Sequence, residues 1–288
     1  MMRRGRVLIT GSSGFLGKNL LEYFKSRGYH IVPFDISLGK DLLNPNDLLR
    51  SLRSADFVCH LAAVGDVYLA GENPKLAATV GVAGTANLID VANKLKNIKK
   101  IVYASTWEIY GHPVYQPIDE KHPCNPDHPY SISKYGGELM VRSKLNNVPW
   151  VILRLGSAYG RHMRGNAVIP LFIKKAREGE KIEITGDGSQ TRQFTHARDI
   201  ARAFEKALSA NVKNDLFNIV SGETQSISEI AHIVNKYIPV RIKFVPARKA
   251  DVESAKISNK KASEKLGWKS GIVFEDGFRD LVKSLGSK

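Results

Sequence analysis

The chain has 288 residues, which is long enough to bury a sizeable core as one large domain or two closely joined ones. Hydrophobic residues make up 43% and charged residues 25%, as in ordinary globular proteins, and this balance argues against a disordered or fibrous chain. The 43 lysines and arginines outnumber the 28 aspartates and glutamates, and the formal net charge of +15 favours anionic partners.

The distribution of the basic residues indicates which kind of anionic partner to expect. They are spread along the chain, and no aromatic-basic RNA-binding signature accompanies them, so we expect a phosphorylated small molecule rather than nucleic acid. No apolar run reaches the roughly 18 residues that span a bilayer, and we expect no membrane association and a cytoplasmic location. Cys59 and Cys124 provide neither a disulfide framework nor metal-ligand spacing, so no metal site is predicted.

The first half of the chain alternates apolar runs with stretches of helical periodicity. Continuous apolar runs, typical of buried parallel strands, lie at residues 6–10, 30–34, 56–63, 100–105 and 148–155. Helical periodicity appears at residues 15–27, 44–53, 75–97 and 130–146. This alternation predicts a doubly wound α/β fold with a parallel sheet.

The composition changes after residue 156. Gly- and Arg-rich loops, GRHMRGN and GDGSQTRQ, separate shorter helical stretches near residues 166–178, 198–210 and 226–237. We therefore predict a nucleotide-binding domain over residues 1–156. Residues 157–288 are predicted to form mainly a smaller α/β substrate-binding region, with some segments returning to the sheet.

A glycine-rich loop, VLITGSSGFLG, joins the first predicted strand to the first predicted helix. Gly11, Gly14 and Gly17 permit a tight turn and the close approach of a pyrophosphate to the helix amino terminus. Asp35 ends the next strand at about the separation expected for a carboxylate that binds ribose hydroxyls. A carboxylate there repels a 2′-phosphate, so the pattern favours NAD over NADP.

A second motif lies in the stretch HPYSISKYGGE. Tyr130 and Lys134 are four residues apart, so a helix places both side chains on one face. The lysine charge is expected to lower the pKa of the phenol toward the range of a general base. Thr106, at the end of the preceding strand, is expected to link Tyr130 to a substrate hydroxyl.

Six segments together resemble one known family: GSSGFLG, HLAA, STWEIYG, PYSISKYGGE, GDGSQTRQF and KASEKLGW. In this order and at these separations they are similar to the extended short-chain dehydrogenase/reductase family, in its nucleotide-sugar epimerase and dehydratase branch. The resemblance runs from the first strand to Trp268. It implies a Rossmann-type domain with bound NAD and a nucleoside-diphosphate sugar held by the carboxyl-terminal region.

The resemblance also implies roles for individual residues. The pyrophosphate would be held by Gly11, Gly14, Phe15, Leu16 and Gly17. Asp35 would bind the adenosine ribose, Asp41 and Leu42 would lie beside the adenine, and Leu61, Ala62 and Ala63 would line the edge of the third strand.

The catalytic triad implied by the resemblance is Thr106, Tyr130 and Lys134, the last two also contacting the cofactor. Arg192 and Arg248 fall where the family places arginines on the phosphates of the sugar nucleotide, a task that suits bidentate guanidinium contacts. For each arginine an ordinary surface charge remains the alternative, most of all for Arg248.

The sequence departs from the family pattern in three places, the third of which is a pair of residues. Gly81 stands where the family usually has Asn before a V-x-G-T motif, and Ser157 replaces the Asn that follows the fifth strand. Asn166 could supply the lost hydrogen bond. Trp107 and Glu108 follow the catalytic hydroxyl, and an indole cannot replace the acid that many dehydratases carry there.

The motifs favour a nucleotide-sugar 4-epimerase of the UDP-glucose/UDP-galactose type, acting through a transient 4-keto sugar. A 4,6-dehydratase, a decarboxylase or a 4-ketoreductase that uses Glu108 remains an alternative, as does a salt-bridge or helix-capping role for this residue. A non-catalytic NAD-sensing or nucleic-acid-binding protein is a further alternative, which the intact triad disfavours. The apolar faces of residues 75–97 and 130–146 favour a homodimer.

Overall fold

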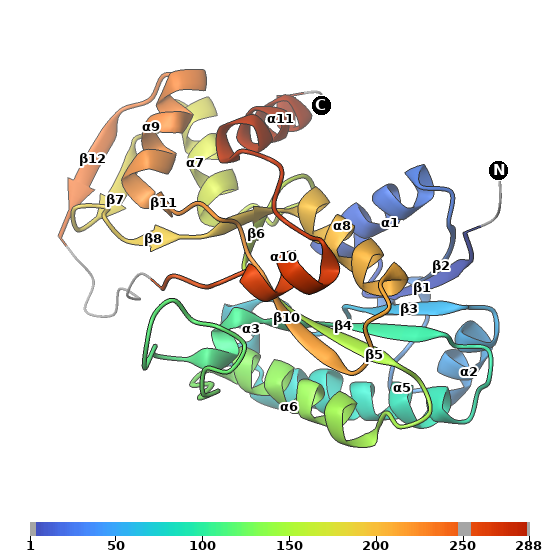
Figure 1. Ribbon diagram of the computed structural model, residues 1–288. Helices are drawn as coiled ribbons and strands as arrows, with labels where there is room; N and C mark the ends of the chain where they lie inside the picture. Colours follow the sequence, from blue (N-terminus) through green and yellow to red (C-terminus); the bar gives the residue numbers. More distant parts are fainter. Residues whose placement is uncertain (1–3, 247–254, 287–288) are drawn as a thin grey trace.

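The central sheet has six parallel strands. The computed structural model describes residues 4–246 and 255–286, and Figure 1 shows this sheet with helices on both sides and a smaller group of helices and short strands beside it. The strand order is β10-β5-β4-β3-β1-β2. The bounds are β1 Arg6–Thr10, β2 His30–Phe34, β3 Phe57–His60, β4 Lys100–Thr106, β5 Trp150–Leu155 and β10 Asp215–Ile219. The predicted doubly wound α/β fold is confirmed.

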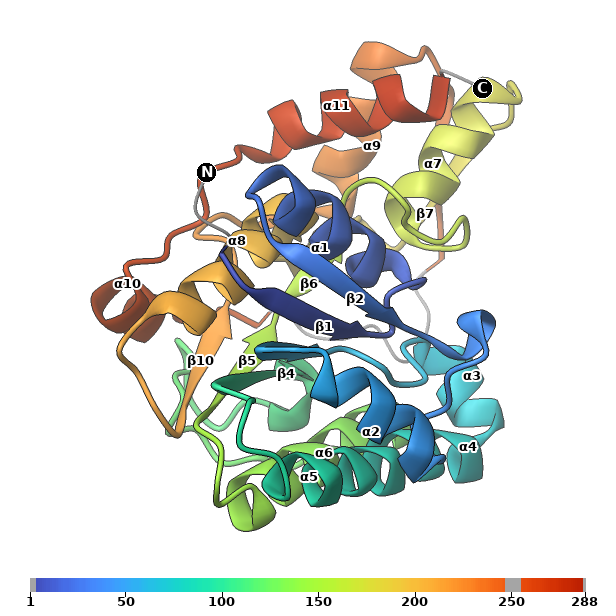
Figure 2. The same ribbon diagram turned by 90° about the vertical axis from the view of Figure 1, so that its right-hand side faces the viewer.

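The continuous apolar character of the strands reflects burial on both faces of the sheet. In β1, Val7 and Ile9 face one core, whereas Leu8, between them, faces the other. Helices α1 (Phe15–Ser26) and α8 (Ala197–Ser209) cover the first face, and α2 (Pro45–Arg53), α5 (Gly84–Asn93) and α6 (Pro129–Lys144) cover the second (Figure 2). A strand buried on both sides has no polar alternation, which is why its sequence reads as one apolar run.

The edge strand β10 comes from the carboxyl-terminal half of the chain, where the sequence predicted that some segments return to the sheet but did not locate this strand. Its sequence, DLFNI, contains two polar residues, and it pairs in parallel with β5. The Asn218 amide oxygen accepts a hydrogen bond from the Tyr110 hydroxyl at 2.7 Å, so a polar residue is accommodated at this edge. Tertiary pairing, rather than local pattern, makes this segment a strand.

The helix predicted over residues 75–97 is interrupted. The chain forms α3 (Val67–Glu72), α4 (Pro74–Ala78), a π-helical turn η2 (Thr79–Ala83) and then α5. The Thr85 hydroxyl, in the first turn of α5, donates to the carbonyl of Gly81 in this π-helical turn at 2.6 Å. A Cβ atom at Gly81 would lie 3.1 Å from the Ser133 Cβ of α6, so the glycine permits close packing of the two helices where the family usually has Asn.

A buried ion pair joins α6 to the sheet. Glu138 and Arg154 are at most 2% exposed, and their side chains meet at 2.6 and 3.2 Å. Ser105 donates to the second Glu138 oxygen at 2.9 Å, and Arg154 also donates to the Tyr110 hydroxyl at 2.9 Å. The charged pair therefore ties α6 to β4, β5 and the turn η3 (Trp107–Tyr110).

The carboxyl-terminal elements build a third core beside the sheet. One short element, η1 (Ile36–Leu38), follows β2. The remaining carboxyl-terminal elements are β6 Ser157–Tyr159, α7 Val168–Arg177, β7 Ile182–Thr185, β8 Thr191–Arg192, β9 Phe194–His196, β11 Gln225–Ser226, α9 Ile227–Tyr237, β12 Ile242–Val245, α10 Lys260–Leu266 and α11 Phe274–Gly286. Phe172, Ile184, Ile230 and Phe278 are among the residues that fill this core. Within the described ranges, no helix combines the length and the apolar character needed to cross a membrane.

We predict that Glu138→Gln destabilises the protein by about 3 kcal/mol, because it leaves the Arg154 guanidinium buried without its counter-charge. Urea denaturation followed by circular dichroism measures the change. The matched control is Arg279→Gln, which breaks an exposed ion pair with Asp276 on α11 and should change stability by less than about 1 kcal/mol. Equal effects of the two substitutions would contradict a structural role for the buried pair.

Candidate active site

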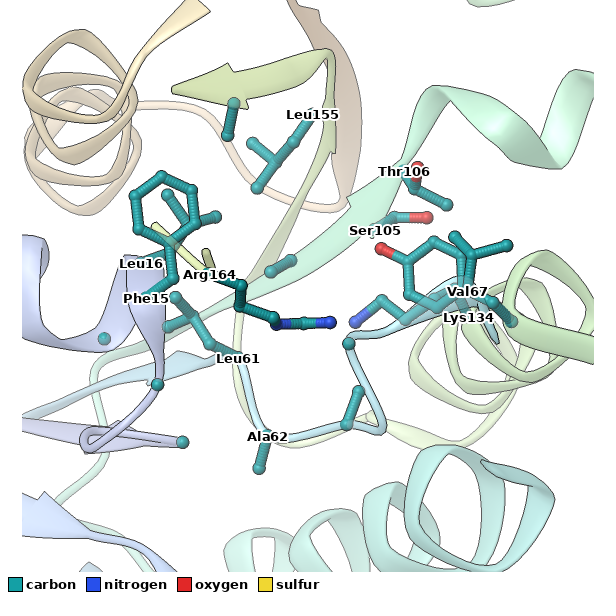
Figure 3. A pocket seen from close by; sticks show the side chains of 18 of the residues that line it. Phe15, Leu16, Leu61, Ala62, Val67, Ser105, Thr106, Lys134, Leu155 and Arg164 are labelled. Atoms are coloured by element: carbon teal, nitrogen blue, oxygen red, sulfur yellow. The ribbon is translucent and has the colours of Figure 1, made fainter. Parts of the chain in front are cut away.

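The principal cavity lies at the carboxyl ends of β1, β3, β4 and β5. Its volume is about 590 Å³, and it opens where the strand order reverses between β1 and β3, the usual ligand site of such sheets. Figure 3 shows Phe15, Leu16, Leu61 and Ala62 along one part of the wall and Thr106 and Lys134 along another. The predicted residues in its lining are Gly11, Gly14, Phe15, Leu16, Gly17, Asp35, Leu61, Ala62, Ala63, Thr106, Glu108, Tyr130, Lys134 and Ser157.

The glycine-rich loop has the close backbone packing that its sequence predicts. Gly11 has φ +70°, a conformation that favours glycine, and a Cβ atom there would lie 2.9 Å from the Ala62 nitrogen. A Cβ atom at Gly17 would lie 2.0 Å from the Gly11 carbonyl oxygen. The loop therefore leads directly into α1 at the cavity lining, and the amino terminus of a helix at a cavity suits a pyrophosphate.

Asp35 holds a carboxylate at the end of β2. It accepts hydrogen bonds from the Ser13 amide at 3.0 Å, the Ser37 amide at 3.0 Å and the Ser37 hydroxyl at 2.8 Å. Burial by itself would raise the pKa of Asp35, but these hydrogen bonds outweigh it and hold the pKa below its ordinary value. An ionised carboxylate beside the glycine-rich loop fits the ribose of NAD, and the dinucleotide fits the residues present.

A buried chain of hydrogen bonds fixes the β3 edge of the cavity. The Thr10 hydroxyl accepts from the Leu61 and Ala62 amides at 3.1 and 3.2 Å and lies 2.6 Å from His60 Nδ1. His60 Nε2 lies 3.0 Å from the Thr85 hydroxyl, which already donates to Gly81. Burial and the charge of Lys134 lower the pKa of His60 to about 3, so the ring is neutral and serves as a structural link.

Tyr130 and Thr106 meet at the end of β4. Pro129 begins α6, and the His128 side chain accepts the Tyr130 amide at 3.3 Å, which orients the first turn. Burial raises the pKa of the Tyr130 phenol and the charge of Glu108 raises it further, whereas the hydrogen bond with Thr106 lowers it. The shift is opposite in direction to the lowering that was predicted from Lys134.

The main cause is burial of the phenol itself, and the environment of Lys134 explains why its charge does not offset that burial. The Lys134 side chain is 3% exposed, and its ammonium lies 4.6 Å from the centre of the Tyr103 ring. Burial lowers the pKa of Lys134 to about 7, with the charge of Glu138 acting in the opposite direction. A substantial fraction of the amine is therefore neutral near pH 7, which weakens its effect on the phenol.

Glu108 and Trp107 extend the site toward the carboxyl-terminal region. Burial raises the pKa of Glu108 to about 7, while the charge of Arg192 lowers it and that of Asp127 raises it. Trp107 and Ser157 line both the principal cavity and a small adjoining cavity of about 10 Å³ that Arg192 also lines. The Thr106 hydroxyl accepts the Glu108 amide at 3.3 Å and so caps the turn η3.

Of the predicted residues that the structure describes, Asp41, Leu42 and Asn166 do not line the cavity, and Arg192 lines only the small adjoining one. The Asp41 carboxylate accepts the Leu43 amide at 2.9 Å, and Leu42 is buried in the core against Gly84. Asn166 is exposed before α7. Arg248 lies outside the described residues.

Ser13, Ile36, Ser37 and Arg164 line the cavity but were not predicted as site residues. Ser13 lies inside the GSSGFLG segment and Ser37 follows Asp35 directly, so proximity to these motifs was an available signal. Arg164 belongs to the Gly- and Arg-rich loop GRHMRGN. The composition of this loop indicates anion binding, but no feature of the local sequence predicts that Arg164 lies in the cavity that holds the cofactor.

Comparisons with known proteins agree with this geometry. Residues 7–220 match the NAD dependent epimerase/dehydratase family. The chain is 33% identical over 96% of its length to the putative UDP-glucose 4-epimerase of Methanocaldococcus jannaschii, 97% of which is covered. It is 28% identical over 96% of its length to UDP-N-acetyl-alpha-D-glucosaminuronate decarboxylase of Bacillus cytotoxicus, again with 97% covered.

The fold has a close counterpart among solved structures. The structure of Thermotoga maritima UDP-glucose 4-epimerase with UDP-glucose superposes with a TM-score of 0.88 at 25% identity, covering 98% of each chain. The predicted family, the NAD cofactor and the assignment as an enzyme are confirmed. From its sequence, its fold and its cavity, the chain belongs to the NAD-dependent epimerase/dehydratase family of nucleotide-sugar enzymes.

Proposed function

We propose that the protein is a 4-epimerase that interconverts UDP-glucose and UDP-galactose. The observation that carries the proposal is the cluster of Thr106, Tyr130 and Lys134 in the same cavity as the glycine-rich loop and Asp35. An epimerase needs no catalytic group beyond this set and NAD. The similarity to proteins named UDP-glucose 4-epimerase over nearly the whole chain supports the choice of reaction.

The proposed chemistry begins at the 4-hydroxyl of the sugar. Bound NAD supplies a reversible hydride acceptor for the C4 hydrogen. Tyr130 takes the hydroxyl proton, with Thr106 sharing a hydrogen bond to the same phenol and Lys134 setting its charge environment. After the 4-keto sugar turns over, the phenol returns its proton and the hydride returns to the opposite face, so no net oxidation occurs.

We assign the binding residues by their place in the cavity. Gly11, Gly14, Phe15, Leu16 and Gly17 would hold the NAD pyrophosphate, Asp35 the ribose, and Leu61, Ala62 and Ala63 the β3 edge. Ile36 and Ser37 are better placed beside the adenine than Asp41 and Leu42, because they line the cavity. Ser157 and Arg192 would hold the sugar-nucleotide diphosphate next to Trp107.

A second candidate function is decarboxylation or 4,6-dehydration, and Glu108 favours it. A carboxyl group whose pKa is raised to about 7 can donate or accept a proton near neutral pH, as both reactions require after the 4-keto sugar has formed. The similarity to a nucleotide-sugar decarboxylase at 28% identity supports this alternative.

We also propose that the protein is a homodimer. Ile132 and Leu139, seven residues apart on α6, are 52% and 43% exposed. Leu69 on α3 and Leu76 on α4 are 43% and 46% exposed, and both helices pack against α6. Several large apolar side chains exposed on three adjoining helices are typical of an interface between subunits.

We predict that incubation with UDP-glucose yields UDP-galactose, a product of unchanged mass. NMR identifies the C4 epimer, and mass spectrometry checks the mass. UDP-glucuronate, GDP-mannose and dTDP-glucose serve as competing substrates. Tyr130→Phe should reduce the rate at least about 100-fold, because it removes the proton acceptor. Loss of water or carbon dioxide from any of these substrates, with no C4 epimer formed, would reject the epimerase in favour of the second candidate.

We predict that Glu108→Gln keeps epimerase activity and moves the acid limb of the kcat/KM profile to lower pH. The Glu108 charge raises the pKa of Tyr130, so its removal lowers that pKa and makes the phenolate available at lower pH. Rates measured from pH 5 to 10 test this, with Asp127→Asn as a neighbouring carboxylate control. A loss of activity of about 100-fold or more at every pH would instead make Glu108 a catalytic acid or base.

We predict that Ile132→Asp combined with Leu139→Asp converts the dimer to a monomer, because two buried, unpaired charges oppose association. Light scattering coupled to gel filtration measures the mass. Val273→Asp, at an apolar position 53% exposed and away from α6, is the control. A wild-type protein that is already monomeric would reject the proposed interface.

A further inference from the structure

The segment Arg161–Arg164, here called the strap, runs beside the cofactor half of the cavity. It lies between β6 and α7 and is held first at α1. The Arg161 carbonyl accepts the Asn19 amide at 2.8 Å, and His162 Nε2 lies 2.7 Å from the Glu22 carboxylate. These partners belong to the helix that begins at the glycine-rich loop, so one end of the strap is tied to the β1 side of the crevice.

The other end of the strap is tied to the β3 side. The Arg164 guanidinium forms an ion pair with Asp66, which also accepts the Tyr68 and Leu69 amides at 2.9 and 3.1 Å and so begins α3. Burial by itself would raise the pKa of Asp66, but the hydrogen bonds from Leu69 and Arg164 hold the pKa below its ordinary value. The ion pair is therefore present at neutral pH.

The position of Arg164 connects the strap to the cavity. Its side chain is among the lining residues, together with Gly65. Figure 3 shows the Arg164 guanidinium extending across the cavity toward the Lys134 side chain, with Leu61 and Ala62 along the adjacent wall. The strap therefore joins the elements that follow β1 and β3, the two strands between which a dinucleotide binds in this fold.

We propose that the strap is a clasp that retains NAD, closed by the ion pair between Arg164 and Asp66. The Arg164 and Asp66 side chains are 46% and 19% exposed, so the pair is accessible to solvent. The free energy of such an exposed ion pair is small, so the pair opens spontaneously. It is still large enough to slow the release of a ligand bound beneath the strap. The clasp acts on cofactor exchange and does not depend on which sugar reaction follows.

A direct contact between Arg164 and NAD would predict the opposite effect of Asp66 on the rate of NAD release. If Arg164 acted by contacting an NAD phosphate directly, Asp66 would compete with the cofactor for the guanidinium. Loss of the Asp66 charge would then leave NAD release unchanged or slow it. In the clasp, the same change opens the strap and speeds release, so the sign of the effect separates the two.

The test measures release of NADH by its fluorescence after the loaded protein is diluted into excess NAD. Asp66→Asn keeps the side-chain cap of α3, because Asn is an equally good N-cap, and should speed release roughly two- to fivefold. Arg164→Gln should do the same, and the double variant should be no faster than either single one, since both remove one interaction. Added salt should speed release by a larger factor from the wild type than from either variant, because only the wild type has the ion pair for salt to screen in addition to the charges of NADH.

The matched control is Asp276→Asn, which breaks an exposed arginine–aspartate pair on α11 and should leave the release rate unchanged. Release from Arg164→Gln that is faster than from the wild type, with Asp66→Asn unchanged or slower, would overturn the clasp. Unchanged release from both variants would overturn it as well. The measurement involves no sugar nucleotide, so its outcome is independent of the proposed epimerase activity.

Discussion

The buried ion pair between Glu138 and Arg154 is the constraint on which the arrangement of the active site depends. Glu138 lies on α6, two turns beyond Tyr130 and one turn beyond Lys134, and Arg154 lies one residue before the end of β5. Two charges in a low-dielectric interior tolerate little displacement, because each loses its solvation and depends on the other. The pair therefore sets the position of the catalytic helix relative to the strand ends.

Hydrogen bonds extend this constraint across the sheet. Ser105 joins the pair from β4, immediately before Thr106, and Arg154 reaches the Tyr110 hydroxyl in the turn that carries Trp107 and Glu108. Tyr110 in turn donates to Asn218 of β10. One connected network thus positions the hydroxyl, the phenol and the carboxyl group that meet in the cavity, although none of the network's own members was predicted as a site residue.

Burial also governs the electrostatics of the site. It lowers the pKa values of His60 and Lys134 and raises those of Glu108 and Tyr130, so each group is shifted toward its neutral form. Groups so shifted respond strongly to any charge placed beside them, because little solvent screens the interaction. Such a site is well suited to moving a proton when an anionic nucleotide-sugar substrate arrives.

The sequence by itself determined the parallel strands β1 to β5, the glycine-rich loop, Asp35 and the Thr106, Tyr130 and Lys134 set, although the edge strand β2 is only partly buried. These are local features: apolar runs, glycine spacing and a four-residue helical repeat each act within one element. Tertiary structure decided the rest. The strand β10 exists through pairing with β5, and Asp66 and Arg164 meet although they are 98 residues apart. The pKa of Tyr130 follows from desolvation, a property of the folded interior that spacing along the chain does not encode.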